Sequence, residues 1–175
     1  MNALADTARL LAPCLYVLQK MGKISKHHLS KVLYVADKFH IAKYGRSLTG
    51  DVYIAMNNGP VPSMIYDFIK LVEGKTDGAY IAKYAKYIPE FIGFRPPHEV
   101  FAKKDPDLDF LSKSAIDALN EGIATVGPMS FGQRTDFTHD SAWKSTPRNQ
   151  KISIVDMARA AGANDAMVEY IKATM

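Results

Sequence analysis

Histidine and carboxylate side chains are the first candidates for chemistry in this sequence. The one local group of this kind is Asp136, His139 and Asp140. Metal ions accept such ligands, but two carboxylates and an imidazole in a polar turn often occur together by chance. His27 and His28 are adjacent, so their side chains diverge on a helix. We therefore predict no metal site and no cofactor.

Nucleophilic catalysis has equally weak support. Cys14 is the single cysteine, and it lies on the apolar face of an expected helix, where a thiol is usually buried and inert. Ser63 follows Pro62 and is not part of a nucleophile elbow. The phosphate-binding motifs G-x-G-x-x-G and G-x-x-x-x-G-K-[ST] do not occur. We predict that the chain is not an enzyme, and we keep a hydrolytic enzyme with an unrecognised site as an alternative.

Residues 31–37 are more informative about binding. Val32, Leu33 and Ala36 form the apolar stripe of a helix, whereas Tyr34 and Asp37 lie beside that stripe on one flank. Two interpretations remain open for this flank. Tyr34 and Asp37 contact a partner, or Tyr34 packs against a neighbouring loop with its hydroxyl group bonded nearby.

The second candidate for binding is the proline-stiffened segment 58–62. Asn58, Gly59 and Pro60 indicate a turn, and Pro62 suits the first position of a following helix. Ordered loops held by rigid helices commonly carry contacts, but a rigid helix entry explains the same residues. His139 and Trp143 are also open to two interpretations, and a pair that caps the core is favoured over direct contact with a partner.

Helical patterns must position these candidates. The clearest helix spans 25–44, with Ser25 as its N-cap, Leu29, Val32, Leu33 and Ala36 facing inward, and Gly45 at its end. Other helices are expected at 10–21 with Pro13 in its first position, at 62–74, near Tyr80, Tyr84 and Tyr87, and at 112–127, 130–137, 154–161 and 165–173. Residues 91–95 and 99–103 predict a small two-stranded ribbon. The expected fold is mainly α, a compact helical bundle with at most a small β-hairpin.

The composition indicates a single cytoplasmic domain spanning 1–175. Apolar residues make up 47% of the chain, enough for a buried core. The longest apolar runs are far too short to cross a bilayer, and the N-terminal residues lack the pattern of a signal peptide. We therefore predict no association with a membrane.

Charge is distributed unevenly along the chain. Residues 1–104 hold 15 Lys and Arg against 8 Asp and Glu, whereas residues 105–175 hold 7 against 10. A basic half favours an acidic partner, either nucleic acid or the acidic face of a protein, although an ordinary solvated surface gives the same balance. Arginine clusters are absent, which weakens the case for sequence-specific binding of nucleic acid.

Taken together, these segments resemble the Panacea domain, which is found in SocA-like antitoxins and in some phage-associated proteins. The matching residues are Lys31–Tyr34, Ala36–Asp37, Tyr44–Gly45, Leu48–Gly50, Tyr53–Ala55, Asn58–Pro62, Tyr66, Leu111–Ser112, Thr138–His139 and Trp143. The resemblance is strongest over 10–145, so 146–175 is expected to be a helical extension at the C-terminal side.

The resemblance implies an antitoxin that neutralises a cognate protein toxin by direct binding, with presentation of the toxin to a ClpXP-type protease as an associated activity. Some members carry a DNA-binding segment, but too little sequence precedes the first helix here, so nucleic acid is not required. A nucleic-acid-binding regulator is kept as an alternative. The residues expected to bind the partner are Lys31, Tyr34, Asp37, Asn58, Pro60, Val61 and Tyr66. Structural roles are expected for Gly45, Gly59, His139 and Trp143.

Overall fold

The computed structural model describes residues 2–75 and 79–175. Their α-helices are α1 (Ala3–Met21), α2 (Lys26–Tyr44), α3 (Ser63–Val72), α4 (Ile88–Phe91), α5 (Lys113–Val126), α6 (Phe131–Thr138), α7 (Ser141–Ser145), α8 (Ile154–Ala160) and α9 (Asp165–Thr174). Their strands are β1 (Ile24–Ser25), β2 (Tyr53–Met56), β3 (Gly59–Pro62), β4 (Ile92–Arg95) and β5 (Glu99–Ala102). Short 3-10 helices cover Ala79–Ile81 and Leu108–Phe110. The fold is mainly helical.

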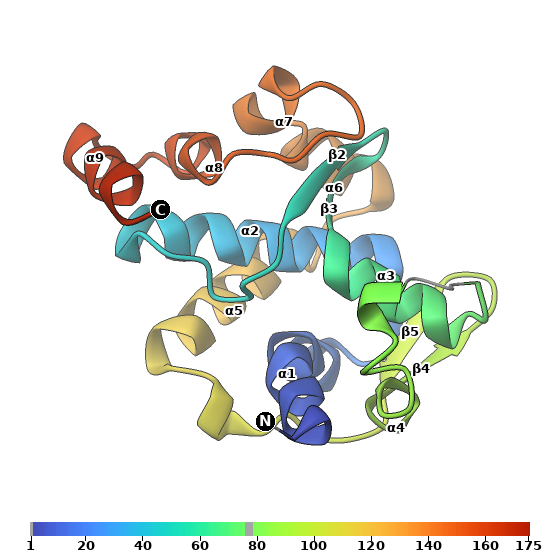
Figure 1. The fold of residues 1–175 in the computed structure, drawn as a ribbon. Helices are drawn as coiled ribbons and strands as arrows, with labels where there is room; N and C mark the ends of the chain where they lie inside the picture. Colours follow the sequence, from blue (N-terminus) through green and yellow to red (C-terminus); the bar gives the residue numbers. More distant parts are fainter. Residues whose placement is uncertain (1, 76–78) are drawn as a thin grey trace.

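Helix α2 forms the axis of the molecule (Figure 1). It packs against α1, α5, α6, α8 and β3. The predicted inward residues Leu29, Val32, Leu33 and Ala36 are all fully buried, which confirms the central helix and its core face. The Ser25 hydroxyl accepts a hydrogen bond from the His28 amide at 3.0 Å and so caps the helix, as predicted.

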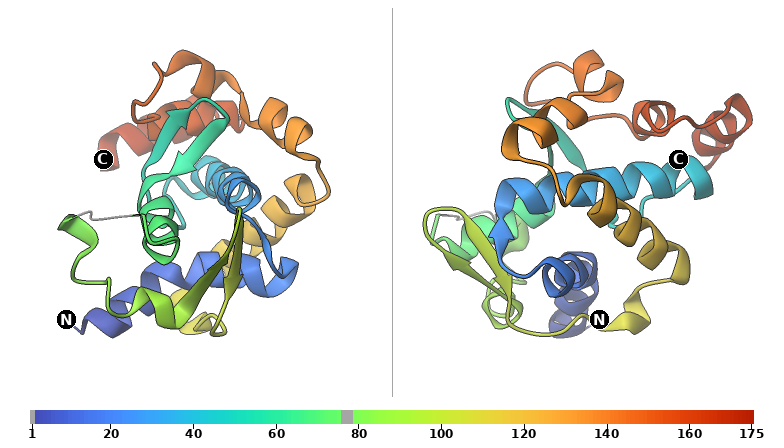
Figure 2. Two further views of the ribbon diagram at one scale, coloured as in Figure 1. Left: turned by 90° about the vertical axis from the view of Figure 1, so that its right-hand side faces the viewer. Right: turned by 180° about the vertical axis from the view of Figure 1, so that it is seen from behind.

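The close approach of α5 to α2 depends on one small residue. A Cβ atom at Gly122 would lie 2.8 Å from the Val32 carbonyl oxygen and 3.0 Å from the Ala36 side chain. Glycine therefore lets the two backbones pack closely. Figure 2 shows that α1, α4 and the β4–β5 hairpin lie on one side of α2, while α6 to α9 lie on the other.

The expectation of at most one small hairpin is wrong. The predicted ribbon exists as β4–β5, and β1 extends it to a three-stranded antiparallel sheet in the order β1-β5-β4. A second antiparallel pair, β2–β3, joins Met56 to Gly59 across the two-residue turn Asn57–Asn58. Four-residue strands carry little periodicity, and Pro60 and Pro62 disfavour a strand. Their ring nitrogens share one side of β3, however, so the other side remains able to pair.

Helix α1 begins earlier than its sequence pattern predicts. Its N-cap is Asn2, and Pro13 lies inside the helix instead of at its first position. Proline removes the hydrogen bond to the carbonyl group of Arg9. Arg9 is exposed and Pro13 is buried, so the proline ring packs in the core.

Helices α8 and α9 form where they were expected, with bounds that differ by one residue. Ile152, Met157, Ala158 and Ile171 belong to the same hydrophobic cluster as the residues of α1 and α2. The segment after residue 145 therefore packs into the common core. No helix among the described residues is long and apolar enough to cross a membrane.

Candidate functional site

The tip of the β2–β3 hairpin, residues 55–60, is held by side chains from other elements. Trp143 Nε1 donates to the Met56 carbonyl oxygen at 2.9 Å, and Lys31 Nζ donates to that of Pro60 at 2.8 Å. His27 Nε2 lies 3.3 Å from the Asn58 carbonyl oxygen. Because four-residue strands are weakly stable alone, these contacts fix the tip on the body of the protein.

Gly59 is required where the tip meets α2. Its φ of +102° lies in a region that side chains rarely adopt. A Cβ atom there would stand 2.9 Å from Thr138 Oγ1 and 3.0 Å from Lys31 Nζ. The backbone thus approaches the lysine closely. Gly45 has a φ of +73° and faces Tyr170, where a Cβ atom would lie 2.5 Å from the ring.

Lys31 is 1% exposed. Its ammonium group donates to Pro60, and burial together with the nearby charge of Arg134 lowers its pKa to about 7. His27 lies one helical turn before it and stacks on Phe131 with the ring centroids 4.0 Å apart. Burial, Lys31 and Arg134 lower the pKa of His27 to about 4, so its imidazole is neutral at pH 7.

Three stacked side chains support the outer face of the tip. The His139 ring lies parallel to Trp143, with centroids 3.5 Å apart and an interplanar angle of 6°. The Arg148 guanidinium group lies 3.6 Å from the Trp143 ring centroid and also donates to the Ala55 carbonyl oxygen. Trp143 also packs against the hydrophobic core.

Tyr34 and Asp37 are fully buried, so neither side chain is exposed to a partner in this conformation. The Tyr34 hydroxyl donates to the Asp140 carboxylate at 3.1 Å, which agrees with the packing interpretation. Asp37 accepts from the Ser47 hydroxyl, the Leu48 amide, Thr49 and the Tyr53 hydroxyl. It therefore orders the loop that leads into β2.

Lys31 and Pro60 are also buried, although Lys31 lines a pocket beside the hairpin tip. The other predicted partner residues stay accessible: Asn58 is exposed, and Val61 and Tyr66 are half-buried. Residue types alone did not distinguish the buried candidates from the accessible ones. The middle of α2 is buried on nearly all sides, so its polar residues are buried as well.

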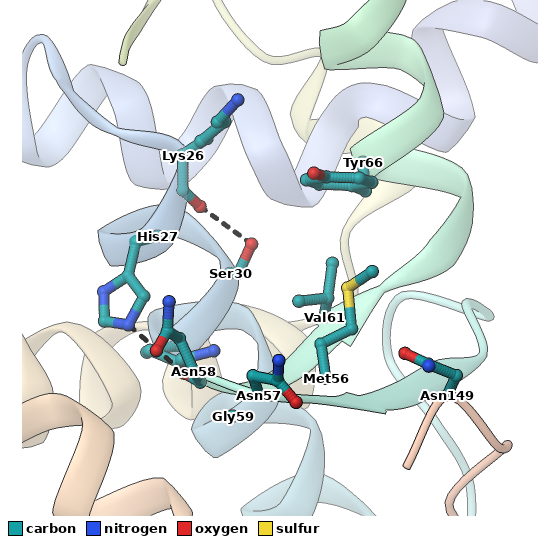
Figure 3. Close-up of a pocket in the computed structure, with 11 residues that line it drawn as sticks. Lys26, His27, Ser30, Met56, Asn57, Asn58, Gly59, Val61, Tyr66 and Asn149 are labelled. Carbon is teal, nitrogen blue, oxygen red and sulfur yellow. Dashed lines mark hydrogen bonds between the residues drawn. The ribbon is translucent and has the colours of Figure 1, made fainter. Parts of the chain in front are cut away.

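A pocket of about 310 Å³ opens beside the hairpin tip (Figure 3). It is lined by Lys26, His27, Ser30, Lys31, Met56, Asn57, Asn58, Gly59, Val61, Tyr66 and Asn149. Figure 3 shows Lys26 and Tyr66 on one side and Asn57 and Asn58 on the other. A neighbouring pocket of about 320 Å³ shares Lys26, His27 and Asn58, and adds Ser25, His98 and Phe131. We call the two pockets together the tip groove.

Sequence reasoning did not select Lys26, His27, Asn57 or Phe131 for this site. Lys26 and His27 lie in the first turn of α2, before the buried residues of this helix begin at Leu29. Phe131 comes from α6, about a hundred residues away in sequence, and is 51% exposed. Only the folded chain brings these side chains to one surface.

The other chemical candidates are separated or occupied. Asp140 bonds to Tyr34 and forms an ion pair with Lys38, and His139 stacks on Trp143. In residues 2–75 and 79–175, no three His, Cys, Asp or Glu side chains are grouped to hold a metal ion. Cys14 is fully buried, and burial raises the pKa of its thiol to about 12.

Comparison with known proteins connects this geometry to a family. Neither the curated proteins nor the solved structures contain a match to the chain. The family model described as antitoxin SocA-like, Panacea domain, matches residues 29–144, which is more than half of the sequence. This range runs from α2 through the hairpin tip to Trp143 in α7. The chain therefore belongs to the SocA-like antitoxin family with a Panacea domain.

Proposed function

We propose that this chain neutralises a protein toxin by binding it directly through the tip groove. The observation that supports the proposal is that side chains from other elements fix the hairpin tip in place. Its backbone carbonyl groups are bonded inward to His27, Lys31 and Trp143, while the side chains of Asn57 and Asn58 point outward. A contact surface that is already ordered loses little conformational entropy on binding.

The groove has the composition of a protein-binding surface. Tyr66 and Phe131 offer aromatic area, Met56 and Val61 form an apolar floor, and the amides of Asn57 and Asn58 supply hydrogen bonds. Aromatic anchors surrounded by polar groups are typical of binding hot spots. A toxin whose active surface covers this groove would be occluded from its own substrate.

Addition of a partner strand to the hairpin is not favoured. The outer edge of β2 is already paired, because the Ala55 amide donates to Gln150 and the Ile152 amide donates to Tyr53. On β3, Pro60 and Pro62 have no backbone N–H to donate. Side-chain recognition in the groove therefore supports the proposal better than strand pairing.

Co-expression with the adjacent reading frame tests the proposal. The intact chain should rescue growth from a toxic neighbour product and co-purify with it. Alanine at Tyr66 or Asn58 should weaken capture by about tenfold or more, as expected for a hot spot. Alanine at Tyr44 or Asn120, exposed residues outside the groove, should leave capture unchanged. Rescue by both groove variants at wild-type level would place the interface elsewhere, and failure of the intact chain to bind would remove the proposal.

Two further features stay predictions from the family. We expect the chain to act in the cytoplasm, where its toxin is made. Presentation to a ClpXP-type protease predicts that toxin levels fall in cells that contain this protease and recover in cells that lack it. A nucleic-acid-binding regulator would instead retain short DNA duplexes with a strong dependence on salt.

A further inference from the structure

Two cations beside the tip groove lack the partners that buried charges usually have. Lys31 is 1% exposed and Arg134 is 7% exposed. Among the described residues, no carboxylate lies within ion-pair distance of either side chain. Arg134 donates to the Met129 carbonyl oxygen, and its Nε has no hydrogen-bond partner. A buried charge without a counter-charge is costly.

The fold pairs its other buried charges. Lys38 lies 2.6 Å from Asp140, and the buried carboxylate of Glu73 lies 2.9 Å from Lys26. Asp37 accepts five hydrogen bonds, four from residues 47–49 of the neighbouring loop and one from the Tyr53 hydroxyl of β2. The lack of compensation is therefore particular to the surroundings of Lys31 and is not a general property of this chain.

The groove gives these unpaired groups access to a ligand. Lys31 lines the pocket that also contains Tyr66, and its ammonium group uses one of three donors, toward Pro60. His27 lines both pockets, and its Nδ1 is buried without a partner. The lining of the two pockets includes Lys26, His27, Lys31 and His98 but no aspartate or glutamate. The lining of the two pockets thus has basic side chains but no carboxylate to serve as their counter-charge.

We propose that the pocket of the tip groove that Lys31 lines receives the carboxylate of an aspartate or glutamate side chain on the bound toxin, with Lys31 as its counter-ion. This inference rests on the proposed function and adds the chemistry of the contact. Charge complementarity selects this occupant, because a carboxylate supplies the missing counter-charge in a site shielded from water.

The proposal has a measurable signature in pH. Without the toxin the pKa of Lys31 is about 7, so much of the ammonium group is deprotonated at higher pH. A bound carboxylate stabilises the protonated form, so binding takes up a proton above pH 7. The affinity should then fall by up to about tenfold for each pH unit above 7.

The experiment measures toxin affinity between pH 6 and 9 for the wild-type chain, Lys31→Met and Lys26→Met. Lys26 is the matched control because it lines the same pocket but is paired with Glu73. We expect the pH dependence in the wild type and in Lys26→Met, and its loss in Lys31→Met. Acidic residues of the toxin are also neutralised one at a time, because this requires no change in the antitoxin. One such substitution in the toxin should abolish the dependence of affinity on pH. If this dependence is unchanged in Lys31→Met and in every toxin variant, the inference is overturned.

A small carboxylate-bearing molecule distinguishes failure of the proposed function from failure of the carboxylate pocket. If the wild-type chain binds no toxin, the Lys31 ammonium group is titrated by NMR in the presence of N-acetyl-L-glutamate α-amide, whose one carboxylate is on the side chain, or of N-acetyl-L-glutamine α-amide, which has no carboxylate. A rise in the pKa of Lys31 with the carboxylate probe alone would support the carboxylate pocket without an antitoxin. No shift with either probe, or equal shifts with both, would overturn it.

Discussion

Single residues in the matching segments have different physical roles although their types are similar. Tyr34 and Tyr66 are both tyrosines near the groove, but Tyr34 is fully buried and Tyr66 is half-buried at the pocket. The Tyr34 ring packs edge-to-face against Tyr53, with centroids 5.2 Å apart, and its hydroxyl group reaches Asp140. Tyr34 therefore holds α2 to α7, whereas Tyr66 is available to a partner.

This difference predicts opposite outcomes for two alanine variants. Tyr34→Ala should lower the free energy of unfolding by about 3–5 kcal/mol, because it removes a buried aromatic ring. Tyr66→Ala should cost about 1 kcal/mol or less. Tyr34→Phe keeps the ring and should cost about 1 kcal/mol for the lost hydrogen bond. Urea unfolding measures all three, and equal midpoints for the two alanine variants would contradict the assignment.

His27 predicts a loss of stability in acid. Its folded pKa of about 4 lies below the ordinary value of 6.5, so the unfolded chain binds the proton more readily. The stabilisation is present above pH 6.5 and is lost as the pH falls toward 4. His27 is only half-buried and solvent screens part of the effect, so we expect a loss of about 1 kcal/mol.

Urea unfolding at pH 7 and pH 5 tests this prediction by comparing the wild type with His27→Gln. Glutamine does not titrate, so the variant should lose less stability than the wild type between the two pH values. An equal loss would show that the proton is taken up by another group.

At the scale of elements, helix α3 is capped by a residue outside its own N-terminal turn. Its N-cap position is Pro62, which makes no side-chain cap. The Asp51 carboxylate instead accepts from the Met64 amide at 2.9 Å and the Ile65 amide at 3.0 Å. The loop that contains Asp51 thus stabilises α3 and links the β2–β3 hairpin to this helix.

Asp51→Ala should therefore destabilise the protein by about 1–2 kcal/mol, the usual range for loss of a helix cap. Ser112→Ala is the matched control, since Ser112 caps α5 locally by accepting from the Ala115 amide. Hydrogen exchange should show faster opening of the first turn of α3 only in the Asp51 variant. Protection of that turn at the wild-type level would contradict the cap.

At the scale of the whole molecule, one helix connects the core to the groove. The middle of α2 is buried by α1, α5, α6 and α8, and its first turn supplies Lys26 and His27 to the groove. The C-terminal segment takes part in this arrangement, because Met157 and Ala158 of α8 are buried in the common core. The position of the groove thus depends on packing along the full length of the chain.

Removal of residues 146–175 should therefore unfold the protein or lower its thermal midpoint by well over 10 °C, because it exposes buried apolar area at about 25 cal/mol per Å². Removal of 165–175 alone deletes α9, in which Val168 and Ile171 are buried, and should have a smaller effect. Circular dichroism melts of the two truncated chains measure this. A shorter chain of 1–145 that melts like the wild type would show that the segment is an independent appendage.

The sequence determined the helical elements where periodicity, caps and stops agree. Ser25 and Gly45 bound α2, and Ser112 begins α5, because these are local interactions between residues a few positions apart. The matching segments also identified the family from residue types alone.

Only the tertiary structure decided which of those residues are accessible. Local patterns contain no information on how many neighbours cover a helix, so Tyr34 and Asp37 could not be distinguished from surface residues. The groove joins Lys26 and His27 of α2 with Asn58 of the hairpin and Phe131 of α6. Contacts between residues so distant in sequence arise from packing, which is why the site could not be predicted before the fold.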